Sequence, residues 1–531
     1  MSDGTAGTGD LTDELIESSV WTDDMLQRAG IPMTDAWIVS VGGGLGSLAL
    51  AHVLRVSGLP AEGLTVLGNG TDPARTYRYL ARNSQIPDQE RLRSDAGSTM
   101  DSIWGFPSYA WREAISAPGF ASTFAPLWQV LTEPILTDYY TPKAGQVYAS
   151  VDRECERIGW QQMLRLGNVR MIRRRAGGGY VTILTPSDQT HQGGTRRLAF
   201  RSRYVHVAVG YPGVRFLPDL QAYRERYSDY SRVVNAYEPH DQVYEELRRR
   251  PSTVLVRGSG IVASRILQRL IDDRDRNGAQ TTIIHLFRNY VDGPQGESAT
   301  FRRPGGNGVA YQGFNFPKAA WGGQLKEQLE QLDGPARAEL IGRMGGTNTP
   351  RRRDWLEQLE RGRNQGFYLQ RVGTVQRVEP GPEQTIATVI RAADGQEHNL
   401  NANVVIDATG LESDITENRL LDDLLTHGGA QRSAYGRFEV TPTFEVAGTR
   451  AEPGRLYASG SMTLGGYYAG VDSFLGLQYA ALAIVDDLAS VGAVTPLNAS
   501  RSVAEWWRWV RNRPPRPAPI PAAGIPVGVG R

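Results

Sequence analysis

Cysteine is almost absent from this sequence of 531 residues, since Cys155 is the only one. A single cysteine excludes an intramolecular disulfide and a dithiol redox pair. The seven histidines are scattered without the spacing of metal ligands, so we predict no metal site. A strong charge of either sign is also missing, because 58 basic residues face 57 acidic ones and leave a net charge of +1. This balance offers no electrostatic reason to expect a nucleic acid or an anionic membrane as partner.

Long hydrophobic runs are scarce as well. Only residues 36–54 form a long, mostly apolar stretch, and they include three consecutive glycines, two serines and His52. A membrane-spanning helix needs about 20 predominantly apolar residues, so these interruptions disfavour a span. The N-terminus is polar and acidic, the opposite of a secretory signal peptide. We therefore expect a cytoplasmic protein with no membrane span.

A glycine-rich turn at residues 42–47 is the first strong motif. It follows an apolar, β-branched run at residues 36–41 and precedes a helical segment and a second apolar strand at residues 64–68. In such a strand–turn–helix–strand unit, glycines allow the tight turn and the close approach of a pyrophosphate, and a small residue lets the helix pack on the strand. The predicted dinucleotide contacts of this turn are Gly42, Gly43, Gly44, Gly46 and Ser47.

The end of the second strand departs from this motif. An acidic residue usually stands there and binds a ribose, whereas this chain has Gly68 and Asn69, with Asp72 further on. Asn69 or Asp72 could reach the ribose hydroxyls. The alternative is that another part of the protein holds this ribose.

A second unit repeats the same order of elements. A strand at residues 253–256 leads into a glycine turn with Gly258, Gly260 and Ala263, then a helix, then a strand at residues 281–287. Alanine at the sixth position of the turn is common where the ligand is NADP. Arg288 follows the second strand, where a guanidinium can bind a 2′-phosphate with two hydrogen bonds. This unit therefore favours NADPH over NADH.

Three further segments have strands that end in small-residue turns. They are VAVGYP at residues 207–212, NVVIDATG at 403–410, and residues 454–488, where Gly460 ends a strand before a long apolar helix. Taken in order with the two glycine turns, these segments resemble the class B-like, single-component flavin-dependent monooxygenases over roughly residues 34–490. The stretch AGVDSFLGLQ resembles the amine N-hydroxylases among them. The Baeyer–Villiger fingerprint is not visible between residues 214 and 251.

The resemblance implies FAD at the first glycine turn and NADPH at the second, with further cofactor contacts at the joints. By similarity to the family, these contacts are Thr409, Gly410, Gly460, Asp472 and Ser473. Residues 311–321 resemble the nicotinamide and substrate loop of the N-hydroxylases, although Gln312 stands where an asparagine is usual. This similarity makes Gln312 and Asn315 candidate catalytic residues.

The fold that these motifs predict is α/β, with two Rossmann-like dinucleotide-binding domains and the NADPH domain inserted into a discontinuous FAD domain. A Gly-rich segment at residues 294–323 is predicted to act as a lid or substrate loop. The expected divisions are a lead-in at 1–33 with one short helix, FAD-binding parts at 34–240 and 366–495, the inserted domain at 250–365, and a terminal helix with a Pro/Gly-rich tail at 496–531.

The predicted activity is that of an FAD-dependent NADPH oxidoreductase whose partners are a small molecule and O₂. By resemblance, reduced flavin forms a C4a-(hydro)peroxide and oxygenates the substrate, with N-hydroxylation of an amine in specialised metabolism as the first interpretation. Baeyer–Villiger or sulfur oxygenation, a cyclase or isomerase that uses FAD as a scaffold, and a binding role without turnover stay open as alternatives. A homo-oligomer is also possible.

Overall fold

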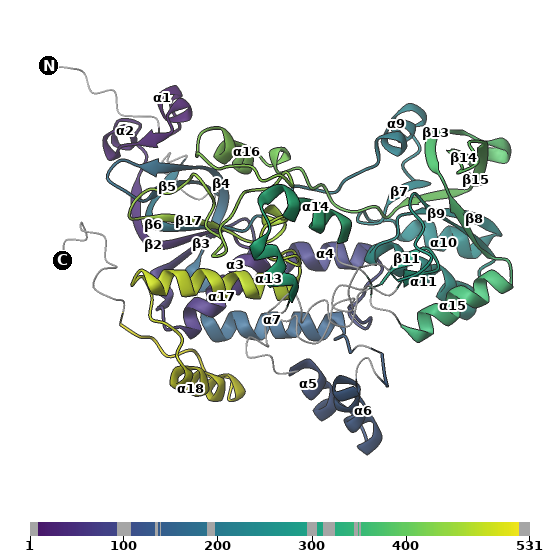
Figure 1. Ribbon diagram of the computed structural model, residues 1–531, viewed down its shortest axis with the longest axis horizontal. Helices are drawn as coiled ribbons and strands as arrows, with labels where there is room; N and C mark the ends of the chain where they lie inside the picture. Colours follow the sequence, from purple (N-terminus) through teal and green to yellow (C-terminus); the bar gives the residue numbers. More distant parts are fainter. Residues whose placement is uncertain are drawn as a thin grey trace.

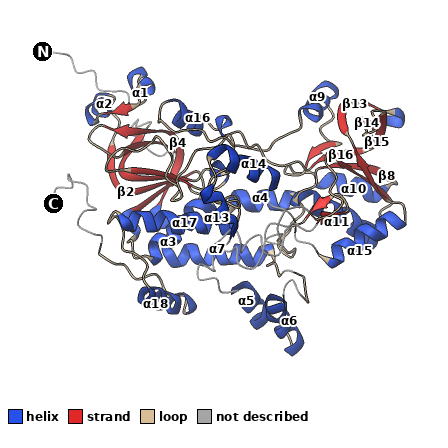
Figure 2. Cartoon of the chain, in the orientation of Figure 1, coloured by secondary structure: helices blue, strands red, loops and turns tan. Residues whose placement is uncertain are grey.

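The computed structural model has an α/β fold with two main sheets, one at each end of the molecule (Figure 1). Helices cover both sheets (Figure 2). The residues that the structure describes are 9–92, 108–132, 136–138, 140–187, 197–294, 305–311, 324–344, 349 and 352–519. None of the helices in these ranges is both long and apolar enough to cross a membrane.

The first sheet has seven strands and is mixed. Its order is β1 (Val20–Trp21), β4 (Leu164–Arg175), β3 (Leu64–Gly68), β2 (Met33–Gly42), β6 (Leu198–Val207) and β17 (Arg455–Ala458), all paired in parallel. A seventh strand, β5 (Tyr180–Pro186), runs antiparallel to both β4 and β6. The apolar run of β2 therefore lies in the middle of the sheet, as expected for a strand that is buried on both faces.

Helices pack on this first sheet because successive side chains of its strands face opposite sides. Ile38 of β2 belongs to the apolar core under α3 (Leu45–Val56), α7 (Ala144–Ile158) and α17 (Phe474–Ser490), whereas Val39 belongs to the core on the other face. Figure 1 shows these three helices side by side beneath the sheet. The other face is covered by α16 (Arg419–Thr426).

The second sheet has five parallel strands. Their order is β12 (Tyr368–Val372), β9 (Thr281–Phe287), β8 (Ser252–Arg257), β16 (Val404–Asp407) and β7 (Val233–Asn235). One face packs against α10 (Asp241–Arg249), α11 (Ile261–Asn277) and α15 (Arg353–Asn364). The other face packs against α9 (Pro218–Tyr227) and a small antiparallel sheet of β13 (Thr374–Pro380), β14 (Ile386–Arg391) and β15 (Glu397–Ala402).

The second sheet extends over more of the sequence than we predicted. Its strands come from residues 233–407, whereas the expected inserted domain covered residues 250–365. The segment NVVIDATG was expected to lie where the chain returns to the first domain. Its strand β16 pairs with β8 and β7 as the last strand of the second sheet in sequence order, and the chain then returns to the first sheet at α16. Strand pairing between segments 150 residues apart, such as Val404 with Val254, is not visible in a local pattern.

The N-terminal lead-in also contains more structure than expected. It has two short helices, α1 (Asp13–Glu17) and α2 (Asp23–Arg28), because the hydroxyls of Thr12 and Thr22 each accept a hydrogen bond from a backbone amide of the helix that follows. At the other end of the described residues, α18 (Ala499–Val510) buries Trp509.

The remaining described elements connect these layers. They are α4 (Arg75–Asn83), α5 (Ser108–Ser116), α6 (Phe120–Thr132), α8 (Trp160–Met163), α13 (Gln324–Gln331), α14 (Gly334–Met344), β10 (Gly305–Gly306), β11 (Val309–Ala310), and the 3-10 turns η1 (Ala61–Gly63), η2 (Pro382–Gln384), η3 (Ile415–Glu417) and η4 (Ser461–Thr463).

Candidate functional site

The two glycine turns have the same backbone geometry. Gly42 ends β2 with a φ of +129°, and Gly258 follows β8 with a φ of +124°. A Cβ atom at Gly42 would overlap the carbonyl oxygen of Ala208, and one at Gly258 would overlap that of Ala408. Both the positive φ and the contact with a neighbouring strand therefore require glycine.

Each turn opens into the N-terminus of a helix whose first amides are free to bind an anion. Gly44 and Gly260 are the N-caps of α3 and α11, and neither helix has a side-chain cap. A Cβ atom at Gly260 would meet nothing within 4 Å, and one at Gly44 would meet only the carbonyl oxygen of Pro73 at 3.9 Å. Open space next to unpaired helical amides suits a phosphate group.

The two joints beside the glycine turns also match each other. The amide of Ala208 donates to the carbonyl oxygen of Val41, and the amide of Ala408 donates to that of Arg257, both at 2.8 Å. In the second joint, the Asp407 carboxylate accepts hydrogen bonds from the Thr409 amide (3.0 Å) and the Leu217 amide (2.9 Å). Burial raises the pKa of Asp407. This side chain therefore ties the end of β16 to the segment that crosses between the two sheets.

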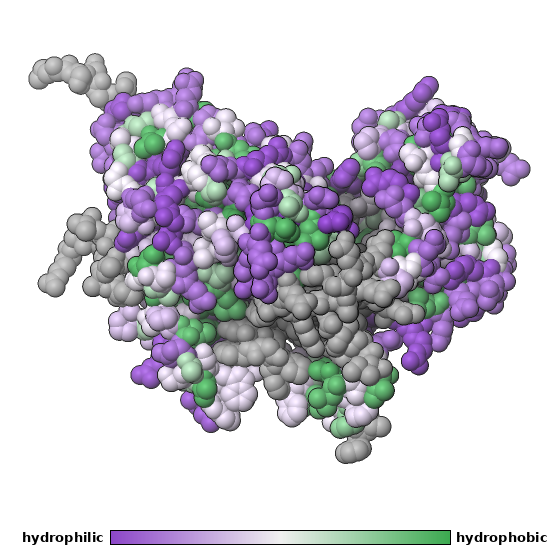
Figure 3. Space-filling view, viewed as in Figure 1, coloured by the Kyte–Doolittle hydropathy of each residue, from purple (hydrophilic) through white to green (hydrophobic). Residues whose placement is uncertain are grey.

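A single cleft of about 1660 Å³ joins the two turns. The space-filling view shows the surface notched between the part with the first sheet and the part with the second (Figure 3). Most of the predicted site residues line this cleft, namely Gly42, Gly44, Gly46, Asn69, Gly258, Gly260, Arg288, Thr409, Gly410, Gly460, Asp472 and Ser473. Segments predicted separately from the sequence thus meet at one place.

Four predicted contacts do not line the cleft. Ser47 and Ala263 are buried where α3 and α11 pack on their strands, as expected for the small residue of the motif. A Cβ atom at Gly43 would lie 2.8 Å from the Cα atom of Gly68. The Asp72 carboxylate accepts from the Ala74 amide at 2.8 Å and pairs with Arg78 at 3.3 Å.

The residues that follow the second strand of each unit occupy matching places. Asn69 follows β3 and Arg288 follows β9, and both are exposed at the cleft. Among the described residues, no hydrogen bond or ion pair engages the Arg288 guanidinium, so it is free to bind a ligand. Of the two ribose candidates in the first unit, Asn69 faces the cleft and Asp72 does not.

The N-terminus of α17 carries a buried carboxyl group at the cleft. The Ser473 hydroxyl accepts from the Gly476 amide at 3.0 Å and caps the helix. The Tyr211 hydroxyl donates to the Asp472 carboxylate at 2.7 Å. Burial raises the pKa of both Asp472 and Tyr211. The Tyr211–Asp472 pair was missed in the sequence, because it joins residues 261 positions apart.

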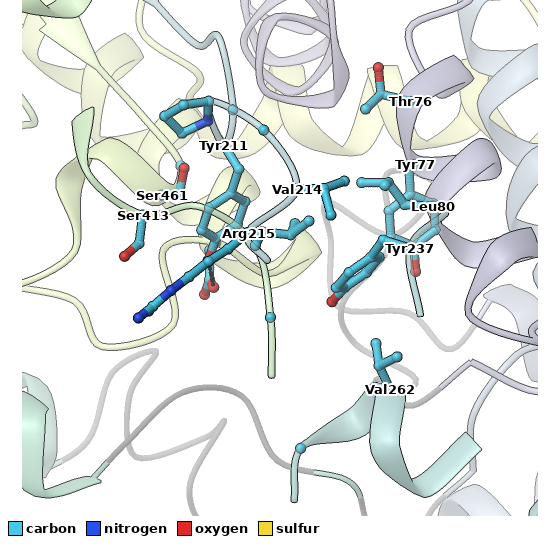
Figure 4. Close-up of a pocket in the computed structure, with 18 of the residues that line it drawn as sticks. Thr76, Tyr77, Leu80, Tyr211, Val214, Arg215, Tyr237, Val262, Ser413 and Ser461 are labelled. Atoms are coloured by element: carbon cyan, nitrogen blue, oxygen red, sulfur yellow. Dashed lines mark hydrogen bonds between the residues drawn. The ribbon is translucent and has the colours of Figure 1, made fainter. Parts of the chain in front are cut away.

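The crossing segment brings further side chains to the cleft. Figure 4 shows Tyr211 and Arg215 between Ser461 and Ser413 on one side and Tyr237 on the other. The Asn235 side-chain amide donates to the carbonyl oxygen of Arg215 at 2.7 Å, which holds this segment in place. Burial raises the pKa of Tyr237 to about 12.

A buried histidine lies behind each glycine turn. In the first unit, Ser40 Oγ donates to Ser47 Oγ at 2.9 Å, and Ser47 Oγ also accepts from the Gly43 amide at 3.2 Å. Because the Ser40 hydroxyl has one hydrogen, His206 Nδ1 is the donor in its 2.9 Å contact with Ser40. His206 Nε2 is then the acceptor from Ser459 Oγ at 2.8 Å.

In the second unit the histidine contacts the turn directly. His285 Nε2 lies 2.7 Å from the carbonyl oxygen of Gly258, which can only accept, so Nε2 is the donor. His285 Nδ1 then accepts from the Tyr368 hydroxyl at 2.8 Å. Burial lowers the pKa of His206 to about 3 and that of His285 to about 4. Both histidines are therefore neutral.

The candidate catalytic residues Gln312 and Asn315 lie outside the described residues, as does most of the predicted loop at 294–323. Within the described ranges, no group of three or more His, Cys, Asp and Glu side chains could hold a metal ion.

No family sequence model matches the chain, and no curated protein sequence does. Solved structures do share its fold. The ornithine hydroxylase of Pseudomonas aeruginosa is 17% identical over 85% of this chain and 98% of its own, with a TM-score of 0.53. The FAD-bound cadaverine monooxygenase of Erwinia amylovora is 13% identical over 86% and 95%, with a TM-score of 0.60.

A third structure comes from Kutzneria sp. 744. It is an ornithine N-hydroxylase with reduced FAD, NADP⁺ and L-ornithine, 14% identical over 86% of this chain and 100% of its own, with a TM-score of 0.58. At these identities the likeness concerns the fold. It confirms the α/β fold that the resemblance to flavin-dependent monooxygenases predicted.

Proposed function

We propose that this protein is an FAD- and NADPH-dependent monooxygenase that hydroxylates an amine nitrogen of a small molecule. The observation that carries this proposal is the single cleft of about 1660 Å³ into which both glycine turns open. Two dinucleotides bound at these turns would extend into the same space, where hydride transfer between them requires close approach. The three structural neighbours named above are amine hydroxylases, which favours nitrogen as the oxygenated atom.

The first unit fits the pyrophosphate of FAD. The free amides at the start of α3 and the open space at Gly44 leave room for the phosphates. Asn69 at the cleft is placed to bind the ribose of the adenosine half. Since Asn69 follows β3, the flavin half would extend the other way, toward β6 and β17, where Gly460 and Asp472 line the cleft.

The second unit fits NADPH. The amides at the start of α11 would bind its pyrophosphate, and Arg288 would bind its 2′-phosphate. On this proposal the second sheet, from 233 to 407, forms an NADPH domain inserted into a discontinuous FAD domain. That division keeps the predicted arrangement and corrects its boundaries.

The chain's own residues would bind and orient the reactants and keep water away. When bound, NADPH supplies a hydride and reduced FAD activates O₂, so that one oxygen atom goes to the substrate and the other to water. Leu464, Phe474 and Leu477 line the cleft near Gly460 and would exclude water from this end. The Tyr211 hydroxyl stays protonated, because burial raises its pKa, and holds the Asp472 carboxyl in place.

The test combines flavin spectroscopy with product analysis. We expect the purified protein to be yellow, to bleach with NADPH under anaerobic conditions, and to regain its colour in air. With a suitable amine, oxygen consumption should accelerate and a hydroxylamine should form. Product formation under strict anaerobiosis, from a flavin that neither NADPH nor NADH reduces, would show that the protein is a non-redox flavoprotein instead.

A further inference from the structure

Arg437 is a buried cation at the cleft that no carboxylate of the described residues neutralises. Its side chain is only 9% exposed, and it lines the cleft. The one hydrogen bond of its guanidinium among the described residues is weak, from Nη1 to the carbonyl oxygen of Gly436 at 3.3 Å. A guanidinium has five N–H donors and cannot lose its charge in a protein. Burying it is unfavourable unless a counter-charge is present.

The acids near Arg437 along the chain already have partners. Glu439 pairs with Arg337 at 3.2 Å, and Glu445 pairs with Arg450. Asp414 pairs at 2.7 Å with Arg432, which lies five residues before Arg437. None of these carboxylates is left to neutralise Arg437.

The described acidic residues of the cleft wall do not pair with Arg437 either. Only two line it, Asp219 and Asp472. Asp219 pairs with Arg257 at 2.6 Å. Asp472 accepts a hydrogen bond from Tyr211, and Arg437 is not among the groups that shift its pKa, so these two side chains do not form an ion pair. No carboxylate of the described cleft wall thus balances Arg437, and an anionic group of a ligand in the cleft would do so.

The position of Arg437 separates it from the first phosphate-binding turn. The Phe438 amide donates to the carbonyl oxygen of Met462 at 3.0 Å, so the segment with Arg437 lies against the residues that follow Gly460. These residues come after β17, which β6 separates from β2 and its glycine turn. Two strand spacings correspond to about 10 Å. The positive charge of Arg437 also acts on the Tyr211 hydroxyl and opposes the rise of its pKa through burial. Arg437 thus lies toward the Tyr211–Asp472 end of the cleft.

We propose that Arg437 binds a carboxylate of the substrate, which makes the substrate an amino acid or another amine that carries a carboxylate group. This inference rests on the proposed function, and it separates two kinds of substrate among the neighbours, ornithine and cadaverine. A carboxylate can accept two parallel hydrogen bonds from one guanidinium. A simple diamine would leave the buried cation unpaired, and sites with an unpaired polar group reject such ligands strongly.

The first test measures carboxylate binding without turnover. Acetate, succinate, L-ornithine and L-lysine are titrated into the flavin-loaded protein, and the absorption spectrum of the flavin is followed. In the wild type at least one of them should perturb the spectrum, and its dissociation constant should rise about 30-fold or more in Arg437→Gln. Arg432→Gln is the matched control, because Arg432 is exposed, pairs with Asp414 and does not line the cleft; this variant should bind like the wild type.

The second test compares amino acids with their decarboxylated counterparts. The KM for L-ornithine should be about 30-fold or more below that for putrescine, and L-lysine should relate to cadaverine in the same way, with the preference lost in Arg437→Gln. If carboxylates bind through Arg437 but no amine is hydroxylated, the carboxylate site at Arg437 is supported and the proposed function is refuted.

Three outcomes would overturn the inference itself. One is that no carboxylate perturbs the wild-type flavin. Another is that amines are hydroxylated with no preference for a carboxylate, which leaves the proposed function intact. The third is that Arg437→Gln loses its flavin, because the arginine would then serve the cofactor.

Discussion

The two glycine-turn units share a backbone and differ in the side chains around it. The φ angles of Gly42 and Gly258 differ by only 5°, and the helices that follow both start from an uncapped glycine. The residue that follows the second strand is Asn69 in one unit and Arg288 in the other. On the proposed function, the backbone that would receive a pyrophosphate is thus common to both, and the surrounding side chains would decide which nucleotide fits.

The packing behind the turns differs too. In the first unit, serine hydroxyls connect His206 to the glycine turn, whereas His285 contacts the second turn directly. At the position after Leu45, Gly46 allows α3 to lie close to Ala208 and Ser459. Val262 stands at the matching position of α11 and points into the cleft (Figure 4). The first unit is therefore more tightly joined to the sheet edge at β17.

Valine at the two N-cap glycines should have the largest effect, on a different cofactor in each unit. Gly44→Val and Gly260→Val put a side chain into open space with φ values of −98° and −85°, which valine accepts, so the protein should fold. The added methyl groups would occupy the phosphate position. Gly44→Val should lose FAD, whereas Gly260→Val should stay yellow while its KM for NADPH rises at least about 100-fold.

The flavin-to-protein ratio and steady-state kinetics measure these effects, with thermal melting as the control for folding. Full flavin occupancy in Gly44→Val would refute the assignment of FAD to the first unit.

Arg288→Ala should reduce the preference for NADPH over NADH. Loss of one charge-assisted contact to the 2′-phosphate costs about 2 kcal/mol, so the KM for NADPH should rise about thirtyfold. The KM for NADH should hardly change, because NADH lacks that phosphate. Asn69→Ala is the matched control and should leave the ratio of the two KM values unaltered. Equal use of NADPH and NADH by the wild type would contradict the role of Arg288.

Leucine at the two buried histidines should produce a smaller and selective effect. His206→Leu leaves the hydroxyls of Ser40 and Ser459 without the histidine, and His285→Leu does the same to the Gly258 carbonyl. Unpaired buried groups cost about 1–3 kcal/mol. We expect FAD binding to weaken about tenfold in His206→Leu, and NADPH binding about tenfold in His285→Leu. Equal effects of both variants on both cofactors would mean that the histidines contribute only to stability.

Acid pH should lower the free energy of unfolding through the same two histidines. Their folded pKa values, about 3 and about 4, lie below the ordinary value of 6.5. As the pH falls below about 6.5, the unfolded chain therefore takes up protons that the folded protein does not, and the free energy of unfolding decreases. By pH 5.5 each histidine should account for about 1 kcal/mol of this decrease.

Denaturant titrations at pH 7.5 and 5.5 measure this loss, and His206→Gln or His285→Gln should reduce it. Wild-type and variant proteins that lose stability equally would show that these histidines titrate normally in the folded state.

Much of the fold was predictable because its signals are local. The strand at residues 281–287 and the strand at 64–68 were predicted at their observed bounds, since apolar β-branched runs next to glycine turns identify buried parallel strands. The membership of β16 in the second sheet was not predictable, because it depends on pairing with a distant strand. The same holds for the candidate site. Its glycines belong to a recognisable sequence motif and were predictable, whereas Arg437 belongs to no such motif and was not.

The sequence by itself determined the two glycine turns, because each needs only glycines with allowed backbone angles and a helix that begins next to them. Only the tertiary structure decided what faces the cleft between them. Tyr211 meets Asp472, His206 connects Ser40 to Ser459, and Arg437 is left without a carboxylate among the described residues. These relations depend on which segments pack together across hundreds of residues, and burial then sets their charge and hydrogen bonding.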